Sequence, residues 1–481
     1  MAEVHREPGA SMGAGGPSPP TLPPAEREDF IAAQRRHRVA ARGYTLLSGF
    51  AIALQGLPFG LVVSPLLIGV AVLVVDTVNL VVPVPDPLTA AAATVAGGDV
   101  STAVLAVPAL LLPGSAWLVG LWWVIHRRVL RTGGASVLQM IGAREPTDDL
   151  AERQWRNVVE EMAIAAALPA PAVKVLGSAA VNAAAIGTSA DDAEVVVTRG
   201  LLDTCNRAET QAVAGHLIAV IGNGDLRIGH AVLAYLMTYN LARALLLWPF
   251  DRGSRRLLAQ VWRALRRGAA PSAEGVAINA LTSRFLAEED DINPVLGLPA
   301  MIIDLGWGVL QFISNLFIVG PLLALPWRRR RYLADATAVQ LTRLPDALAR
   351  ALGHMVEHDV AIPGAGCTAP LFITGTETNA APVSFGEALG IGAPLHPPLH
   401  KRLERLHRMG AMPHGASAAP AARSAGIAAY VLFGVLATPL VVAMLLTVCA
   451  LMYICVLLGL LVVGLVFVVT VLPAHAFLRG L

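Results

Sequence analysis

The chain has 481 residues, of which 55% are hydrophobic and only 15% charged, and its formal net charge is +2. With a mean hydropathy of +0.61, it lies outside the usual range of soluble globular domains and indicates an integral membrane protein, so we expect the lipid bilayer as a partner. The small net charge gives no indication of nucleic-acid binding, and we expect no nucleic-acid partner. The four cysteines form no CxxC pair, which argues against a disulfide framework or a thiolate zinc site.

The N-terminal part predicts a cytosolic tail followed by a transmembrane hairpin. Residues 1–42 are first Pro/Gly-rich and then charged, without a signal peptide, which is typical of a disordered tail. The apolar stretches 44–82 and 102–125 are each long enough to span a bilayer. Arginines flank the pair and the loop between the stretches has no Lys or Arg, so the positive-inside rule places both flanks in the cytosol. Because the first stretch is long, a re-entrant hairpin is the alternative.

Two further apolar pairs follow. Residues 229–250 and 298–327 form a weaker pair, because Arg243 lies inside the first and the loop between them is rich in arginine: Arg252, Arg255, Arg256, Arg263, Arg266 and Arg267. The arginine run 328–331 anchors the end of this pair in the cytosol, so the pair crosses twice or not at all, and we expect two crossings. Residues 425–472 suffice for a final pair. We therefore expect six spans in a bacterial inner (cell) membrane, with both termini cytosolic.

The sequence between these apolar segments is typical of a cytosolic α+β domain. A helix with Trp155 on its apolar face precedes two β-rich pieces at 172–177 and 194–200. A capping-box pattern, Asn206 with Glu209, then opens the next helix. This helix–strand–strand–helix–helix order indicates a domain built around a small sheet.

These patterns divide the chain into six predicted parts. They are a disordered tail (1–42), a transmembrane hairpin (43–126), the first half of the α+β domain (127–228), a second hydrophobic pair with a basic loop (229–327), the second half of the α+β domain (328–423) and a C-terminal transmembrane hairpin (424–481).

The helix after the capping box contains one histidine in an otherwise apolar sequence, GHLIAVIGNGD at 215–225. A helix with His-Glu-x-x-His binds a catalytic zinc through both histidines and uses the glutamate as general base. Here Leu217 follows His216, and Val220 stands where the second histidine would be. Because the helix is apolar on every side, it is predicted to lie in the core of the domain.

Five motifs occur in one order along the chain: VNAAAIG (181–187), VVVTRGLL (195–202), the helix with His216 followed by NGD (223–225), YLADATAVQLT (332–342) and HPPLHKRLERL (396–406). In this order they resemble the HtpX-like and CAAX prenyl endopeptidase group of integral-membrane zinc metallopeptidases. The resemblance runs from about residue 115 to 408. It implies an α-helical integral membrane protein with a cytosolic α+β zincin-like domain of the gluzincin type.

The resemblance also implies where zinc ligands would lie. The family binds zinc through the two histidines of HExxH and a glutamate four residues before the Asp of the AD motif. On this chain His216 matches the first histidine, Leu217 stands at the general-base position, and Val220 and Arg331 stand at the other ligand positions. A catalytic zinc needs three protein ligands, and the fixed charge of Arg331 repels a dication. We therefore expect no intact catalytic residue, no intact metal site and no cofactor.

Other family positions are retained and predict side chains in or around the cleft: Asn182, Asn223, Asp225, Asp335, His396 and Arg402. A buried histidine needs a polar partner, and Asp335 is the natural candidate for His216. Arg331 and Asp335 are spaced i,i+4, so they can also pair along one helix face. His396 begins a Pro-Pro corner, which is more often structural than functional.

A second possible zinc site is HMVEH at 354–358, which fits the inverted motif His-x-x-Glu-His. On a helix, His354 and His358 share one side, and Glu357 is the acidic member of the motif. Both histidines lie away from the apolar face of that helix, towards solvent, and no third ligand is evident. Zinc at this place is the alternative to a metal-free protein.

These observations lead to one functional hypothesis and two alternatives. The first is a membrane-embedded pseudopeptidase that binds membrane-protein or peptide segments, or modulates proteolysis, without cleaving. The second is an active membrane metallopeptidase with recruited ligands such as His354 and His358. The third is a non-peptidase accessory protein of membrane transport, which is favoured if the polar residues of the apolar segments line one path. Those residues are Asn240, Arg243, Asp304 and Asn315.

Overall fold

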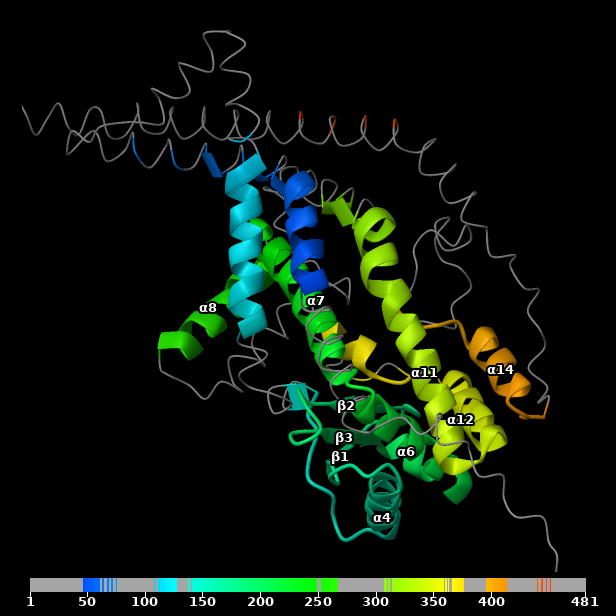
Figure 1. The fold of residues 1–481 in the computed structure, drawn as a ribbon. Coiled ribbons are helices and arrows are strands. Elements are labelled where there is room, and N and C mark those ends of the chain that lie inside the picture. The colour runs from blue at the N-terminus through cyan, green and yellow to red at the C-terminus, as the bar shows by residue number, and fades with distance from the viewer. Residues whose placement is uncertain are drawn as a thin grey trace, which may run out of the picture.

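The computed structural model describes seven stretches of the chain, with isolated positions between them. They are residues 46–60, 111–127, 141–248, 252–266, 314–358, 366–375 and 395–412. A small α+β domain lies at one end of the described molecule, and a group of apolar helices lies at the other (Figure 1). The predicted tail 1–42, Asp304 and nearly all of the predicted pair 425–472 lie outside the described residues.

A three-stranded sheet forms the centre of the α+β domain. Strand β1 (Ala172–Leu176) is parallel to β3 (Glu194–Thr198), and β2 (Ala183–Ile186) is antiparallel to β3, so the order is β1-β3-β2. On the outer edge of β1, the backbone of Arg144 exchanges two hydrogen bonds with Val175, at 2.9 and 2.8 Å. The outer strands of the sheet are thus β1, whose free side pairs with Arg144, and β2.

The predicted element order contains β1 and β3 but omits β2. Three of the four residues in Ala183–Ile186 are alanine, which has a low strand propensity. All four residues are also buried, because α6 covers one side of β2 and α7 and η4 contact it as well. An edge strand enclosed in this way shows no alternation of polar and apolar residues, so periodicity does not reveal it.

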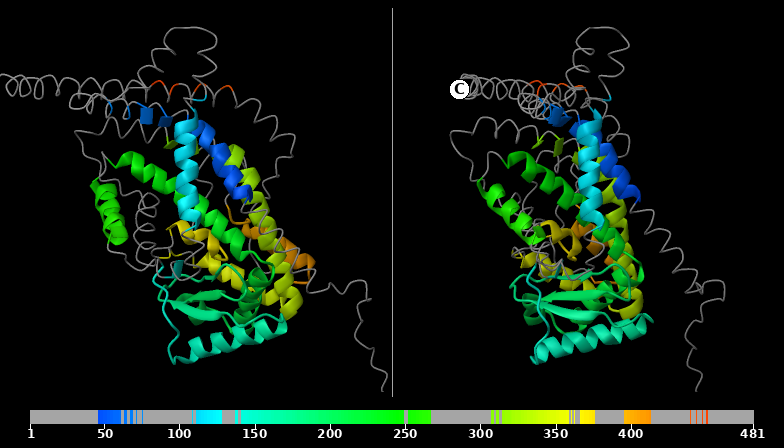
Figure 2. Two further views of the ribbon diagram at one scale, coloured as in Figure 1. Left: turned by 60° about the vertical axis from the view of Figure 1, so that its left-hand side comes forward. Right: turned by 90° about the vertical axis from the view of Figure 1, so that its left-hand side faces the viewer.

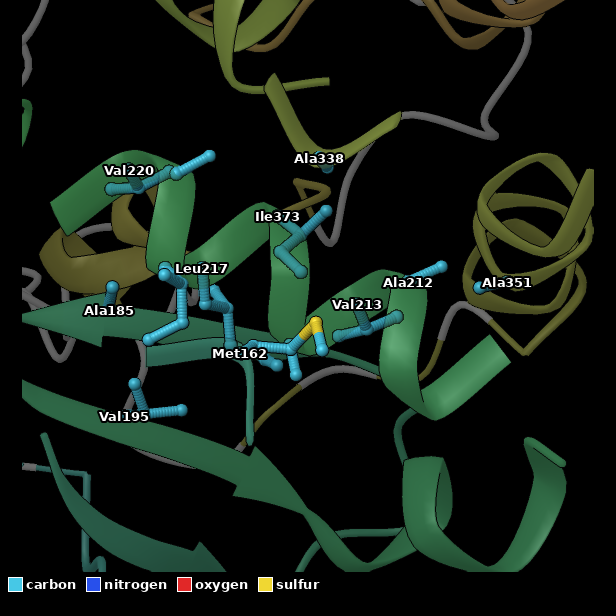
Figure 3. Packing of buried hydrophobic residues seen from close by; sticks show 14 of the residues in the cluster. Met162, Ala185, Val195, Ala212, Val213, Leu217, Val220, Ala338, Ala351 and Ile373 are labelled. Carbon is cyan, nitrogen blue, oxygen red and sulfur yellow. The ribbon is translucent and has the colours of Figure 1, made fainter. Parts of the chain in front are cut away.

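Helix α6 (Arg207–Gly222) runs through the core of the domain, and Figure 3 shows the apolar side chains packed around it. It begins at the predicted capping box, in which the side chains of Asn206 and Glu209 each accept a hydrogen bond from the other's backbone N–H. Every residue from Ala212 to Ile221 is buried. An apolar surface on all sides suits this enclosed position, and the prediction of a core helix is confirmed.

The other helices of the domain enclose α6 and the sheet. They are α4 (Leu150–Ala165), α5 (Arg199–Thr204), α11 (Leu325–Thr342), α12 (Pro345–Glu357), the 3₁₀ helix η4 (Gly366–Leu371) and α14 (Leu399–Arg408). Trp155 and Met162 of α4 are buried in the same core as α6, which confirms the predicted apolar face of that helix.

The apolar helices share a second core. They are Leu46–Gly60, residues 111–127, α7 (Leu226–Leu247) and the π-helix η3 (Asn315–Ala324), which continues directly into α11. Phe59, Leu118, Tyr239 and Ile318 are buried together in this core. In the described stretches, α7 alone is long and apolar enough to cross a membrane. The predicted domain boundaries after residues 228 and 327 fall inside α7 and α11, so the two parts of the molecule share continuous helices.

The first two apolar helices approach each other at small residues. A Cβ atom on Gly60 would lie 2.2 Å from the carbonyl oxygen of Leu111, and one on Gly114 would lie 2.8 Å from Gly60 Cα. Ser115 Oγ donates a hydrogen bond of 2.6 Å to the Gly56 carbonyl. Glycines spaced four apart, here Gly56 and Gly60, are typical of close helix packing in membranes.

Helix α8 (Arg252–Arg266) follows α7 after a short connection and packs beside it. In Figures 1 and 2 it lies at the height of the half of helix 111–127 that is nearer the α+β domain. Leu258 packs against a third apolar cluster, which includes Leu241 of α7 and Val196 of the sheet. The chain therefore turns back towards the α+β domain after α7.

Candidate functional site

Helices α6 and α11 cross where the resemblance places the zinc ligands. Gly215 allows the close approach, because a Cβ atom there would lie 2.7 Å from Thr342 Cγ2. His216 of α6 and Asp335 of α11 are both buried, and His216 Nδ1 lies 2.9 Å from Asp335 Oδ1. The contact expected from the sequence is therefore present, although the ring nitrogen is poorly aligned for a hydrogen bond.

Arg402 of α14 completes this cluster. Its Nε and Nη2 atoms donate to the two carboxylate oxygens of Asp335 at 2.9 and 2.7 Å, and its Nη1 atom donates to the Ile373 carbonyl at 2.9 Å. Burial by itself raises the pKa of Asp335, but the charge of Arg402 and the contact with His216 lower it overall. Burial lowers the pKa of His216 despite the nearby carboxylate, so the imidazole is neutral at pH 7.

Arg331, at the third ligand position, is buried and holds a different part of the chain. Its Nη2 atom lies 2.9 Å from the carbonyl oxygens of Pro370 and Leu371 and 3.0 Å from that of Phe372. Its guanidinium stacks on Trp327, 4.7 Å from the ring centroid. Burial lowers the pKa of Arg331 to about 10, so the group still carries its positive charge at neutral pH.

The predicted alternative, a pair between Arg331 and Asp335 along α11, is wrong. Asp335 binds Arg402 and His216, and Arg331 binds backbone carbonyls. The i,i+4 spacing brings the two side chains to one face of the helix, but segments distant in sequence supply each with other partners.

The segment whose carbonyl groups bind Arg331, residues 370–372, leads onto the outer edge of β2, the side that does not pair with β3. Phe372 forms an antiparallel bridge with Ala184, and Ile373 N donates to the Ala183 carbonyl at 2.9 Å. Asn182, predicted as a cleft residue, fixes the end of this pairing, because its Nδ2 atom donates to the Thr374 carbonyl at 2.8 Å. The chain's own residues 372–374 therefore occupy the edge of the sheet.

The residues at the implied zinc positions do not fit zinc. Leu217 is fully buried in the apolar core, and Val220 lines a small pocket together with Asp225, Trp327 and Arg331. Neither Leu nor Val offers a ligand atom, and the arginine brings a positive charge. Among the residues that the structure describes, no three His, Cys, Asp or Glu side chains are grouped to hold a metal ion.

Asn223 and Asp225 are drawn to α11 by a residue that the sequence interpretation missed. Arg330 binds Asp225 Oδ1 through Nε and the Asn223 carbonyl through Nη2. Burial raises the pKa of Asp225 to about 6, against the opposing effect of Arg330. The sequence interpretation gave Arg330 no role beyond membrane anchoring, yet its side chain binds the residues that follow α6.

His396 is buried beneath the segment that lies on β2. Its Nε2 atom lies 3.3 Å from the Ala369 carbonyl, and Gly375 leaves room for the ring, since a Cβ atom there would lie 2.7 Å from His396 Cδ2. Burial and the charges of Arg331 and Arg402 lower the pKa of His396 to about 3. His396 is therefore neutral and packs under residues 369–375.

The inverted motif does not form a metal site among the described residues. Helix α12 ends at Glu357, so His358 lies just beyond the helix, and the ring centroids of His354 and His358 are 6.5 Å apart. His354 lies 3.8 Å from Glu209, but that carboxylate accepts a hydrogen bond from Arg350 at 2.8 Å. Both histidines are at least partly exposed, as expected for a polar helix face.

Comparison with known proteins identifies the domain. The profile of peptidase family M48 matches residues 149–410. The chain is 30% identical over 274 residues to a Protease HtpX homolog from Streptococcus uberis, which covers 57% of this chain and 78% of that protein. It is 31% identical over 277 residues to a Protease HtpX homolog from Dictyoglomus turgidum, covering 57% of this chain and 75% of that protein. No solved structure shows significant similarity to the chain.

The family model covers more than half of the chain, and the chain therefore belongs to peptidase family M48. The resemblance to the HtpX-like group is confirmed. Members of family M48 are zinc metallopeptidases, and at the positions where the resemblance places the general base and two of the three ligands this chain has Leu217, Val220 and Arg331.

Proposed function

We propose that this protein is a membrane-embedded pseudopeptidase of the HtpX-like group. It binds membrane-protein or peptide segments, or modulates a genuine peptidase, without cleaving. The observation that carries the proposal is the buried, charged guanidinium of Arg331 at the third ligand position. A zinc ion next to it would meet a fixed positive charge in an interior of low dielectric, where repulsion between like charges is strong.

Side chains of the chain itself join the elements around the implied zinc positions. Asp335 and Arg402 join α11 to α14, and Arg402 continues to the Ile373 carbonyl. Arg331 binds the carbonyl groups immediately before Ile373. These charge-assisted bonds tie α11 to α14 and to residues 370–373, next to the implied zinc positions. We expect the fold to be independent of metal.

Residues 372–374 limit where a partner can bind. One strand edge pairs with one extended segment, and Ala183 and Ala184 of β2 already pair with Ile373 and Phe372. A peptide can therefore join β2 only by displacing this part of the chain. The apolar helices remain available to membrane-protein segments, which is consistent with regulation in place of cleavage.

Metal analysis of the full chain, purified in mild detergent, tests the proposal. We expect no stoichiometric zinc, and no change of melting temperature on adding a chelator, because Val220 and Arg331 cannot ligate. About one zinc per chain that survives mild chelation would contradict the proposal. A His354→Ala, His358→Ala double variant is the control, since loss of the zinc in that variant would establish the recruited-ligand alternative.

Restoring the family residues provides a second measurement. Leu217→Glu with Val220→His is expected to give no zinc binding, because Arg331 still places its charge in the cleft. Adding Arg331→Glu supplies the third ligand, and zinc is then expected to bind and to raise the melting temperature. Zinc-dependent cleavage of casein by the double variant would show that Arg331 does not occupy a ligand position.

A further inference from the structure

Helix α8 presents one strongly basic face. Four arginine side chains of this helix are exposed and recur at helical spacing: Arg252, Arg255, Arg256 and Arg263. Ser254 is fully buried on the other side, and Leu258 is half-buried against the apolar cluster that contains Leu241. The helix therefore packs on the molecule with one side and turns its guanidinium groups outward.

The positive charges of this face are not neutralised within the described part of the chain. None of the four arginines forms an ion pair with a described residue. The only hydrogen bond that their side chains make there lies within α8, from Arg263 Nε to the Ala259 carbonyl at 3.2 Å. Four like charges on one helix repel one another. A surface of this kind favours an anionic partner.

Exposed tryptophans accompany the basic face. Trp262 lies on α8 and is 57% exposed, and Trp248, at the end of α7, is 51% exposed. Trp123, near the end of helix 111–127, is 50% exposed and stacks with Arg127, whose guanidinium lies 4.1 Å from the ring centroid. Tryptophan is enriched at the boundary between lipid chains and headgroups.

The position of α8 agrees with such a boundary. It lies at the height of the half of helix 111–127 that is nearer the α+β domain (Figures 1 and 2). It also follows the apolar helix α7, and Leu258 of α8 packs against the apolar cluster that contains Leu241 of α7. A basic amphipathic helix next to an apolar span, with exposed tryptophan, typically lies at an anionic membrane surface.

We propose that the outward face of α8 binds the headgroups of anionic phospholipids on the side of the membrane that faces the α+β domain. The arginine side chains pair with lipid phosphates, and Trp262 lies at the level of the headgroups. This inference rests on the membrane location in the proposed function, and it does not depend on the loss of catalysis.

Native mass spectrometry of the full chain, released from nanodiscs of phosphatidylcholine with or without phosphatidylglycerol, tests the inference. We expect the wild type to retain phosphatidylglycerol in preference to phosphatidylcholine, with a preference that falls as salt rises. In the variant R252Q/R255Q/R256Q/R263Q, the apparent affinity for phosphatidylglycerol is expected to fall at least about tenfold. The control R153Q/R156Q/R207Q/R408Q removes four exposed arginines of α4, α6 and α14 and should behave like the wild type.

Retention of phosphatidylglycerol by the α8 variant at the wild-type level would overturn the inference. The acidic run at 288–291 is the competing partner for the basic face. We compare the wild type with the variant E288Q/E289Q/D290N/D291N, in which this run is neutralised. If the variant prefers phosphatidylglycerol and the wild type does not, the chain itself covers the basic face and the inference fails. Zinc content measured on the same sample separates the two proposals, because a zinc-loaded protein with an intact lipid preference refutes the proposed function alone.

Discussion

Asp335 and Arg402 are two buried charges that depend on each other. Removing one leaves the other unpaired in the interior, which costs about 3–5 kcal/mol of unfolding free energy. We expect Asp335→Leu and Arg402→Met each to lower the melting temperature strongly, and the double variant to be destabilised by clearly less than the sum of both. Full additivity would contradict a closed pair. The comparison is His216→Leu with Asp335→Leu, which removes the unpaired histidine but leaves Arg402 unpaired, so it is expected to recover less than the Asp335→Leu, Arg402→Met pair.

The neutral state of His396 makes stability depend on pH. Its pKa is lowered to about 3 in the folded protein, whereas an unfolded histidine titrates near about 6.5. Below that pH the unfolded chain binds a proton that the folded chain does not, so stability is lost as pH falls. Relative to His396→Asn, the wild type is expected to lose up to about 1.4 kcal/mol per pH unit below pH ~6.5. Denaturant unfolding near neutral and mildly acidic pH measures this difference, and parallel curves would disprove the neutral, buried ring.

At the scale of single residues, the sequence shows which side chains stand at the implied ligand positions, but not what those side chains bind. Leu217, Val220 and Arg331 can be read directly against the motif, and the contact of His216 with Asp335 follows from the need of a buried histidine for a partner. The partners of Arg331 are carbonyl groups about 40 residues away along the chain. Arg402 lies 67 residues from Asp335. No local pattern encodes such pairs, because they arise only when the helices pack.

Among the secondary-structure elements, the segment on the edge of β2 yields the sharpest prediction. Ala184 and Phe372 are directly opposite in an antiparallel bridge, where the Cβ atoms of paired residues lie close enough for a disulfide. We expect Ala184→Cys with Phe372→Cys to form one on mild oxidation, as measured by peptide mapping. Ala185→Cys with Phe372→Cys is the matched control, because side chains of neighbouring strand residues point to opposite faces. Equal cross-linking in both variants would show that the segment does not hold this register.

The elements differ in how far the sequence predicts them. The capping box, the core helix and strands β1 and β3 follow local rules of capping and periodicity. Strand β2 does not, because its burial comes from helices on both sides. The motif HMVEH would place both of its histidines on one helix. It therefore does not predict that α12 ends at Glu357, before His358.

At the scale of the whole molecule, the topology can be tested with a periplasmic reporter enzyme fused at different positions. We expect activity for a fusion near residue 92 and none near residues 200 or 410, according to the arginine distribution. Near residue 275 the six-span expectation requires activity. We expect none there, and hence four spans, because α8 turns back to the height of the half of helix 111–127 nearer the α+β domain. Activity there would mean that α7 crosses the membrane completely, as the two-crossing expectation requires.

The occupied edge of β2 also affects how copies of the protein behave next to one another. An uncovered edge strand recruits extended segments from other chains and so promotes domain exchange and aggregation. Here Phe372 and Ile373 cover one outer strand and Arg144 covers the other. The sheet thus offers a neighbouring copy few unpaired backbone groups, and the domain is protected against strand-to-strand aggregation even at high local concentration.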